Sequence, residues 1–111
     1  MVVLATAVIG GQTDLVASAG GRTLYTYDSD VAGSGVSNCV NGCATVWPPL
    51  TVGAGVSPAG GAGVTGQVGT IRRADGSIQV TYGGRPLYAY SGDTGPGTTN
   101  GSYAGWSIAR P

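Results

Sequence analysis

Four residue types are missing from this chain: histidine, lysine, glutamate and phenylalanine. Without histidine, a Ser-His-Asp triad and an imidazole metal ligand are excluded. Without lysine, Schiff-base chemistry is excluded. Two cysteines and one methionine fall short of the four ligands of a structural zinc site. Acid–base chemistry would rest on five aspartates or the tyrosines, so we expect no enzyme, no metal and no cofactor.

Charge is also scarce, because five arginines and five aspartates give a net charge of zero and charged residues make up 9% of the chain. Only Arg72 and Arg73 are adjacent, which argues against a basic groove for nucleic acid and a polybasic membrane-surface helix. The apolar run at residues 2–9 is too short to span a membrane. Low charge promotes association. The surface therefore fits either a Ser/Thr/Gly coat on a robust extracellular protein or a subunit covered by copies of itself.

The two cysteines, Cys39 and Cys43, flank the turn-forming pair Asn41-Gly42. This reversal predicts a structural disulfide, which implies an oxidising compartment. The alternative is a redox pair, but such motifs usually have two intervening residues at the start of a helix, and no helix is expected here. No basic residue precedes the apolar run, so we do not expect this run to be a complete signal peptide. We expect an exported, extracellular or cell-surface protein in its mature form.

Short apolar segments separated by glycine turns predict an all-β fold, a small sandwich or barrel-like domain with glycine-rich loops. Glycine supplies 22 of the 111 residues, and no stretch has a sustained helical period. Two prolines after Trp47 argue against a helix there. Loops are expected at 28–46 and 53–66. The expected strands are residues 2–9, 13–18, 22–27, 68–73, 77–82, 85–90 and 106–109.

One motif occurs twice, at residues 20–30 and 83–93, with a constant offset of 63. Both copies begin Gly-Gly-Arg-x-Leu-Tyr-x-Tyr and end in aspartate. The repeat predicts two related β-hairpin halves around a pseudo-two-fold axis.

Alternation along each strand places the tyrosines of one copy on one face and its leucine on the other. The tyrosines are Tyr25 and Tyr27 in the first copy and Tyr88 and Tyr90 in the second. Structurally, they would pack with Trp47 and Trp106, and Asp30 and Asp93 would accept backbone N–H groups in the following loops. Functionally, they would form an aromatic platform for a glycan, a cofactor or another subunit.

These motifs resemble the secreted-repeat family of bacterial and archaeal lipoproteins. The resemblance rests on Tyr25-x-Tyr27-x-x-Asp30, Cys39-x-x-x-Cys43, Trp47-Pro-Pro-Leu, Arg73-x-Asp-Gly and the second tyrosine motif with Trp106. It covers residues 13–111, with half-repeats at about 13–50 and 68–111. It implies export or surface attachment and no catalytic residues. The chain departs from the family pattern because no lipobox cysteine precedes the domain.

The segment at residues 1–12 is treated separately as an apolar strand with a predicted role in assembly. Its apolar residues are Val2, Val3, Leu4, Val8 and Ile9. A strand that is apolar on both faces suits a donor strand completing a neighbour's sheet. The alternative is that it belongs to a sheet of its own chain.

We therefore predict a non-enzymatic, self-assembling subunit of a surface filament or layer, a homo-oligomer or homopolymer. The alternative is a cell-surface module that binds polysaccharide or protein through tyrosine and tryptophan surfaces. A redox accessory role using Cys39 and Cys43 is a third, weaker hypothesis. Asp28 and Asp30 provide too few oxygen ligands for a usual calcium site.

Overall fold

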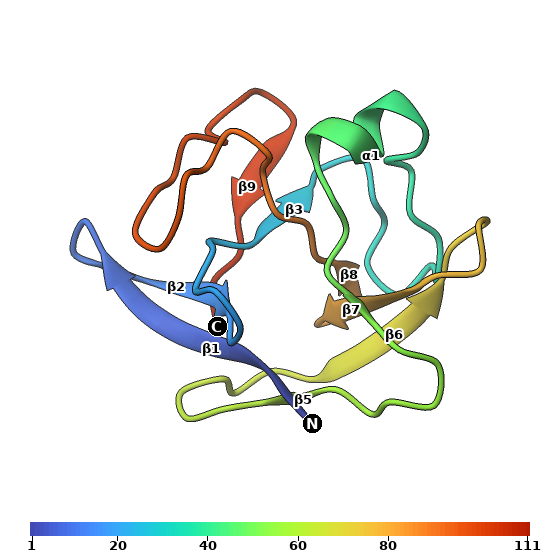
Figure 1. The fold of residues 1–111 in the computed structure, drawn as a ribbon, viewed down its shortest axis with the longest axis horizontal. Helices are drawn as coiled ribbons and strands as arrows, with labels where there is room; N and C mark the ends of the chain where they lie inside the picture. The colour runs from blue at the N-terminus through green and yellow to red at the C-terminus, as the bar shows by residue number, and fades with distance from the viewer.

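The computed structural model describes residues 1–111 and is built from short strands in three small sheets (Figure 1). The sheets have the strand orders β2-β1-β5, β3-β9 and β4-β7-β6, and β8 pairs with β7. The elements are β1 (Val2–Ile9), β2 (Gln12–Ala17), β3 (Tyr25–Tyr27), α1 (Gly42–Val46), β4 (Thr51–Val52), β5 (Ala59–Gly60), β6 (Val68–Arg72), β7 (Ile78–Tyr82), β8 (Arg85–Pro86) and β9 (Trp106–Ile108). The predicted all-β fold is confirmed.

The two halves begin in the same way, as predicted from the repeat, whereas α1 occurs only in the first half. Each begins with an antiparallel hairpin, β1–β2 in the first half and β6–β7 in the second. Each hairpin is followed by two glycines and the Arg-x-Leu-Tyr stretch that crosses the centre of the molecule. The hairpins lie on opposite sides of Figure 1, with β3, β8 and β9 between them. β1 is therefore the structural counterpart of β6.

Glycine turns close both hairpins. Gly10 and Gly11 have φ values of 59° and 81°, which suits the tight turn between Ile9 and Gln12. In the second hairpin, Gly76 has a φ of 88°, and the Asp75 carboxylate accepts the backbone N–H and the hydroxyl of Ser77. These two bonds lower the pKa of Asp75. The Asp-Gly pair thus forms part of the turn between β6 and β7.

The core has two parts, which lie on the two faces predicted for the repeated motif. The leucine of each copy joins an aliphatic cluster, and the first tyrosine of each copy joins an aromatic one. The aliphatic cluster contains Val3, Leu4, Leu15, Leu24, Val80, Leu87 and Ala109. The aromatic cluster contains Tyr25, Cys39, Trp47 and Tyr88.

The predicted disulfide is confirmed, with Cα atoms of Cys39 and Cys43 5.2 Å apart. The expectation that no helix occurs here is wrong, because α1 begins at Gly42. Its one turn is held by the disulfide at the i, i+4 spacing and by the Trp47 N–H, which donates to the Cys43 carbonyl at 2.8 Å. A short-range disulfide and a local backbone bond thus hold a turn whose helix propensity is weak. No helix in the structure is long and apolar enough to cross a membrane.

Several elements differ in length from the sequence prediction. Regular pairing covers only β3 of the expected strand at 22–27 and only β8 of that at 85–90. The remaining backbone groups there bond to several neighbours in turn, including an isolated bridge between Tyr25 and Tyr88. β5 lies inside the expected loop at 53–66 because it pairs with the start of β1.

The apolar strand β1 pairs within its own chain. It is antiparallel to β2 from Leu4 to Ile9 and parallel to β5 at Val2 and Leu4. This arrangement is the stated alternative to donation into a neighbour's sheet. Donation of β1 would require release of these pairings.

Each half also approaches the other through a glycine backbone. The Gly33 N–H donates to the Gly84 carbonyl at 3.1 Å, and a Cβ on Gly84 would lie 2.7 Å from the Gly33 nitrogen. The equivalent residue of the first copy, Gly21, lies against Pro96, where a Cβ would be 3.2 Å from the proline ring. The backbone contact leaves no room for a side chain at Gly84, and a side chain at Gly21 would be crowded by the Pro96 ring.

Gly84→Ala is expected to destabilise the fold much more than Gly20→Ala. Both glycines have φ near 80°, so each alanine adds a backbone cost of about 1 kcal/mol. Only Gly84 faces another backbone, because a Cβ on Gly20 would meet nothing within 4 Å. We expect a further loss of about 1–3 kcal/mol for Gly84→Ala in denaturant unfolding. Equal losses for the two variants would contradict the close approach of the halves.

Candidate functional site

At the centre of the molecule, the two copies of the tyrosine motif form reciprocal hydrogen bonds with each other. The Tyr25 hydroxyl donates to Asp93 Oδ2 at 2.8 Å, and the Tyr88 hydroxyl donates to Asp30 Oδ2 at 2.6 Å. All four side chains are buried. Each copy therefore supplies the phenol for the other copy's carboxylate.

The second oxygen of each aspartate closes its own loop. The Asn38 N–H donates to Asp30 Oδ1, and the Asn100 N–H donates to Asp93 Oδ1, both at 2.7 Å. The two asparagine side chains repeat the pattern, since each donates to a backbone carbonyl next to its aspartate, that of Ser29 or Gly92. The aspartates thus pin loops and join halves at once.

Further hydrogen bonds connect the two halves in the same reciprocal way. Arg22 Nη1 donates to the Asp93 carbonyl, and Arg85 Nη1 donates to the Asp30 carbonyl. The backbones of the first tyrosines also bond, because the Tyr25 N–H donates to the Tyr88 carbonyl at 2.7 Å and the reverse bond measures 2.9 Å. We call the paired arginines, first tyrosines and aspartates the clasp.

Next to the clasp, four aromatic rings form a continuous stack in the order Tyr27, Trp106, Trp47, Tyr90. The two tryptophans are parallel, with centroids 3.8 Å apart and planes at 6°. Tyr27 stacks on Trp106 at 4.4 Å, and Tyr90 lies on Trp47 at 4.5 Å. The second tyrosine of each half thus packs on the tryptophan of the other half.

The stack leaves little open ring face. The inner faces cover one another, and a Cβ on Gly92 would lie 2.5 Å from the Tyr90 ring, so that backbone covers Tyr90 closely. Gly101 covers the edges of Tyr25 and Trp47 in the same way. Tyr103, at the rim, is the only tyrosine among the clearly exposed large apolar side chains, and its hydroxyl accepts a bond from Tyr90. Sugar-binding platforms need an open aromatic face, whereas Trp47 is buried and Tyr27, Tyr90 and Trp106 are half-buried.

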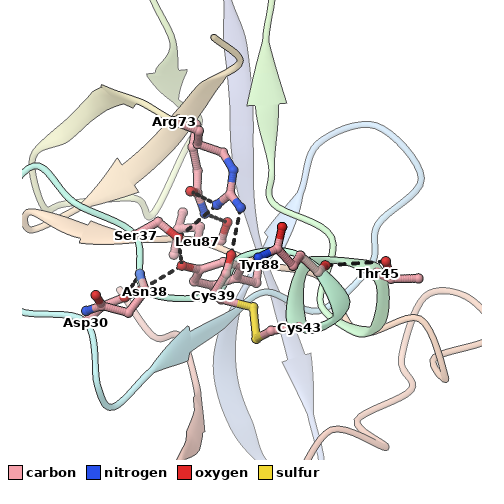
Figure 2. Close-up of a disulfide and its surroundings, with 11 residues drawn as sticks. Asp30, Ser37, Asn38, Cys39, Cys43, Thr45, Arg73, Leu87 and Tyr88 are labelled. Atoms are coloured by element: carbon pink, nitrogen blue, oxygen red, sulfur yellow. Dashed lines mark hydrogen bonds between the residues drawn. A yellow bond between two sulfur atoms is a disulfide. The ribbon is translucent and has the colours of Figure 1, made fainter. Parts of the chain in front are cut away.

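One end of the clasp has an additional polar network that the other lacks. Arg73 donates to Ser37 Oγ and Gln79 Oε1, each at 2.8 Å, and to the Cys39 carbonyl at 2.7 Å. Ser37 Oγ lies 2.5 Å from the Tyr88 hydroxyl. Figure 2 shows the Arg73 guanidinium over Cys39, with Ser37 between Arg73 and Tyr88. Arg73 thus links β6 to the disulfide loop.

The electrostatics of the clasp keep its phenols neutral. Burial raises the pKa of Tyr25 far above its ordinary value, and the hydrogen bond to Asp93 adds to the rise. Burial and the bond to Asp30 likewise raise the pKa of Tyr88 to about 12. A nucleophile or general base needs the opposite shift. These tyrosines act as hydrogen-bond donors.

The other three aspartates also have partners. Asp14 is buried and forms an ion pair with Arg110 at 2.9 Å. Asp28 Oδ1 accepts a bond from Ser107 at 3.0 Å, and Asp75 is bound to Ser77. Asp28 and Asp30 therefore engage different partners, and no cluster of three acidic, cysteine or histidine residues is present.

The structure brings most of the sequence-predicted residues together. The tyrosines, aspartates, tryptophans and disulfide of the motif all lie in or beside the clasp, whereas the apolar residues of β1 lie apart from it. Sequence reasoning missed the arginines of the clasp and the two asparagines. A signal was present, because Arg22 and Arg85 have the same offset of 63 as the tyrosines. Asn38 and Asn100 differ by one residue from that offset and are harder to align.

Tyr25→Phe and Tyr88→Phe are each expected to lower the unfolding free energy by about 1–3 kcal/mol. Either change leaves a buried carboxylate oxygen without its donor. Tyr103→Phe is the matched control, since this hydroxyl is exposed and its loss should change stability by less than about 0.5 kcal/mol. The measurement is denaturant unfolding followed by tryptophan fluorescence. A neutral Tyr88→Phe would show that the exchange does not hold the halves together.

Alkaline pH should unfold the protein. The two phenols have raised pKa values in the folded state, whereas unfolding returns them to about 10. Their contribution is complete below pH 10 and is lost as pH rises through the folded values, at up to about 1.4 kcal/mol per pH unit for each tyrosine. Stability should fall between pH 10 and 12, and the Tyr88→Phe variant should show a shallower fall. The same slope in both proteins would refute this assignment.

Comparison with known proteins agrees with this two-part architecture. A family model described as a secreted repeat of unknown function matches twice, at residues 12–51 and 69–109. Each match contains one copy of the clasp residues, and β1 lies outside the first match whereas most of β6 lies within the second. No curated protein and no solved structure matches the chain. The chain therefore belongs to the secreted-repeat family and consists of two copies of its repeat.

Proposed function

We propose that the protein is a non-enzymatic structural module that acts outside the cell as a self-assembling subunit of a surface filament or layer. The family description as a secreted repeat and the disulfide both support an extracellular location. The site analysis supports a non-enzymatic role, since the clasp uses its aspartates and phenols to join the halves.

The proposal of self-assembly rests on the exposed apolar side chains and the low charge of the surface. Large apolar side chains are exposed on a chain with only five residues of each charge. Large exposed apolar areas mark interaction sites, and a net charge of zero does not keep copies apart. The exposed residues are Met1, Val2, Val8, Val31, Val36, Val40, Val46 and Tyr103.

Their distribution supports contacts at more than one place. Val8 lies near the tip of the β1–β2 hairpin, with 74% of its surface exposed. Val31, Val36, Val40 and Val46 lie between β3 and β4, in the loop and helix that carry the disulfide. A subunit needs two different surfaces to form an open assembly.

Polysaccharide binding is the second candidate. It is supported by Tyr103, with 56% of its surface exposed beside Tyr90. It is weakened by the stack, in which the aromatic rings cover one another's inner faces. A glycan array that gives a signal with the unsubstituted protein and none with Tyr103→Ala would favour this function.

Self-assembly is tested by light scattering after size exclusion over a range of protein concentrations, followed by electron microscopy of the concentrated sample. We expect the mean mass to rise with concentration and ordered particles to appear. The oxidised chain should be used, so that the disulfide loop is intact. A protein that stays monomeric at every concentration would refute the proposal.

A further inference from the structure

One strand edge of the molecule lacks a complete partner. β1 pairs with β2 along Leu4–Ile9, but on its other side β5 reaches only as far as Leu4, whose carbonyl accepts the Gly61 N–H at 2.9 Å. The loop after β5 comes close once more, at Gly63 beside the Thr6 side chain. No backbone bond from this loop reaches Thr6, so the backbone edge is open from Thr6 to the turn, and Figure 1 shows the hairpin projecting from the body of the molecule.

The register defines which backbone groups this edge presents. In an antiparallel hairpin closed by a two-residue turn, the residues flanking the turn bond to each other, and alternate residues bond outward. Ile9 and Ala7 therefore bond to β2, whereas Thr6 and Val8 direct their N–H and C=O groups away from it. Leu4 is two residues before Thr6 and so has the same orientation, and its carbonyl does point to the β5 side.

The counterpart strand shows how such an edge is normally protected. β6 is also an edge strand, but it has five residues and ends in the exposed Arg72. Short edge strands with charged residues resist pairing with other chains. β1 has eight residues with no charge and no proline. Both halves contribute to the clasp and both have a hairpin, but only the edge of β6 is short and carries a charged residue. The edge of β1 has neither feature.

We propose that the open edge of β1 pairs with β1 of a second copy in an antiparallel ladder around a two-fold axis at Ala7. This inference rests on the proposed self-assembly and names the contact that begins it. Thr6 of one copy and Val8 of the other exchange both of their backbone hydrogen bonds. The ladder joins the two hairpins into one continuous sheet.

The chemistry of the edge fits a second copy because the ladder is self-complementary. Ala7 meets its own counterpart at a non-bonded pair, where Cα atoms lie about 4.5 Å apart and a small side chain is favoured. Val8 lies beside Thr6 of the other copy on one face, a favourable cross-strand pair. Asp14, the neighbour of Ala7 on β2, brings no net charge because Arg110 neutralises it.

The first test compares Val8→Lys with Val31→Lys in the full-length chain. Both residues are exposed, at 74% and 65%, but only Val8 lies on the proposed ladder. Val8→Lys should give monomers at concentrations where the unsubstituted protein associates, and Val31→Lys should leave the first association step intact. Circular dichroism and thermal unfolding check that both variants fold.

The second test introduces Ala7→Cys, with Thr13→Cys on β2 as its control. Cα atoms at the axis would lie within disulfide range, so mild oxidation should give a covalent dimer linked through position 7 for the first variant alone. Mass spectrometry identifies the link. If the unsubstituted protein assembles but Val8→Lys has no effect and no such link forms, the ladder is wrong and self-assembly stands. If the unsubstituted protein never associates, both proposals fail.

Discussion

The exchange of phenol and carboxylate between the two copies is the interaction on which the rest of the structure depends. A buried carboxylate needs hydrogen bonds to both oxygens. Each aspartate obtains one bond from its own loop and the other from the opposite half, from Tyr88 for Asp30 and from Tyr25 for Asp93. Neither half can satisfy its own aspartate. The halves therefore fold as one unit, and strands as short as β3 and β8 are stable because the clasp holds the segments that follow them.

This arrangement explains why the most conspicuous residues are not where we place the function. The tyrosines and tryptophans that suggest a binding platform pack against one another, since Tyr27 and Tyr90 stack on the outer faces of the paired tryptophans. The buried phenols of Tyr25 and Tyr88 are bonded to the buried carboxylates, so these interior groups already have partners. What remains for partners is the outer surface, where charge is scarce and valines are exposed. The rigidity of the clasp then serves to hold those outer surfaces at fixed positions.

Much of this fold could be predicted from the sequence, but the reciprocal contacts could not. The repeat, the two faces of its strands, the disulfide and the loop-pinning aspartates follow from local spacing and turn chemistry. A repeat does not reveal which copy a residue contacts, because Asp30 and Asp93 are equivalent as partners for Tyr25. Helix α1 was missed since its stability comes from the disulfide and not from propensity. The pairing of β1 was left open because a strand that is apolar on both faces suits its own sheet and a neighbour's equally well.

The differences between the two hairpins show which features are not needed to form the clasp. Either hairpin supports the clasp, yet β6 ends in arginines and β1 is longer and uncharged. Arg73 bonds to the disulfide loop of the other half, but strand length and the exposed Arg72 take no part in joining the halves, which is why we assign these two differences to contacts between molecules. A two-fold ladder at β1 is closed and gives only a dimer. A filament or layer requires a second contact elsewhere, and the exposed valines between β3 and β4 lie on a different element from the ladder. Assembly would then proceed in two steps, of which only the first depends on β1.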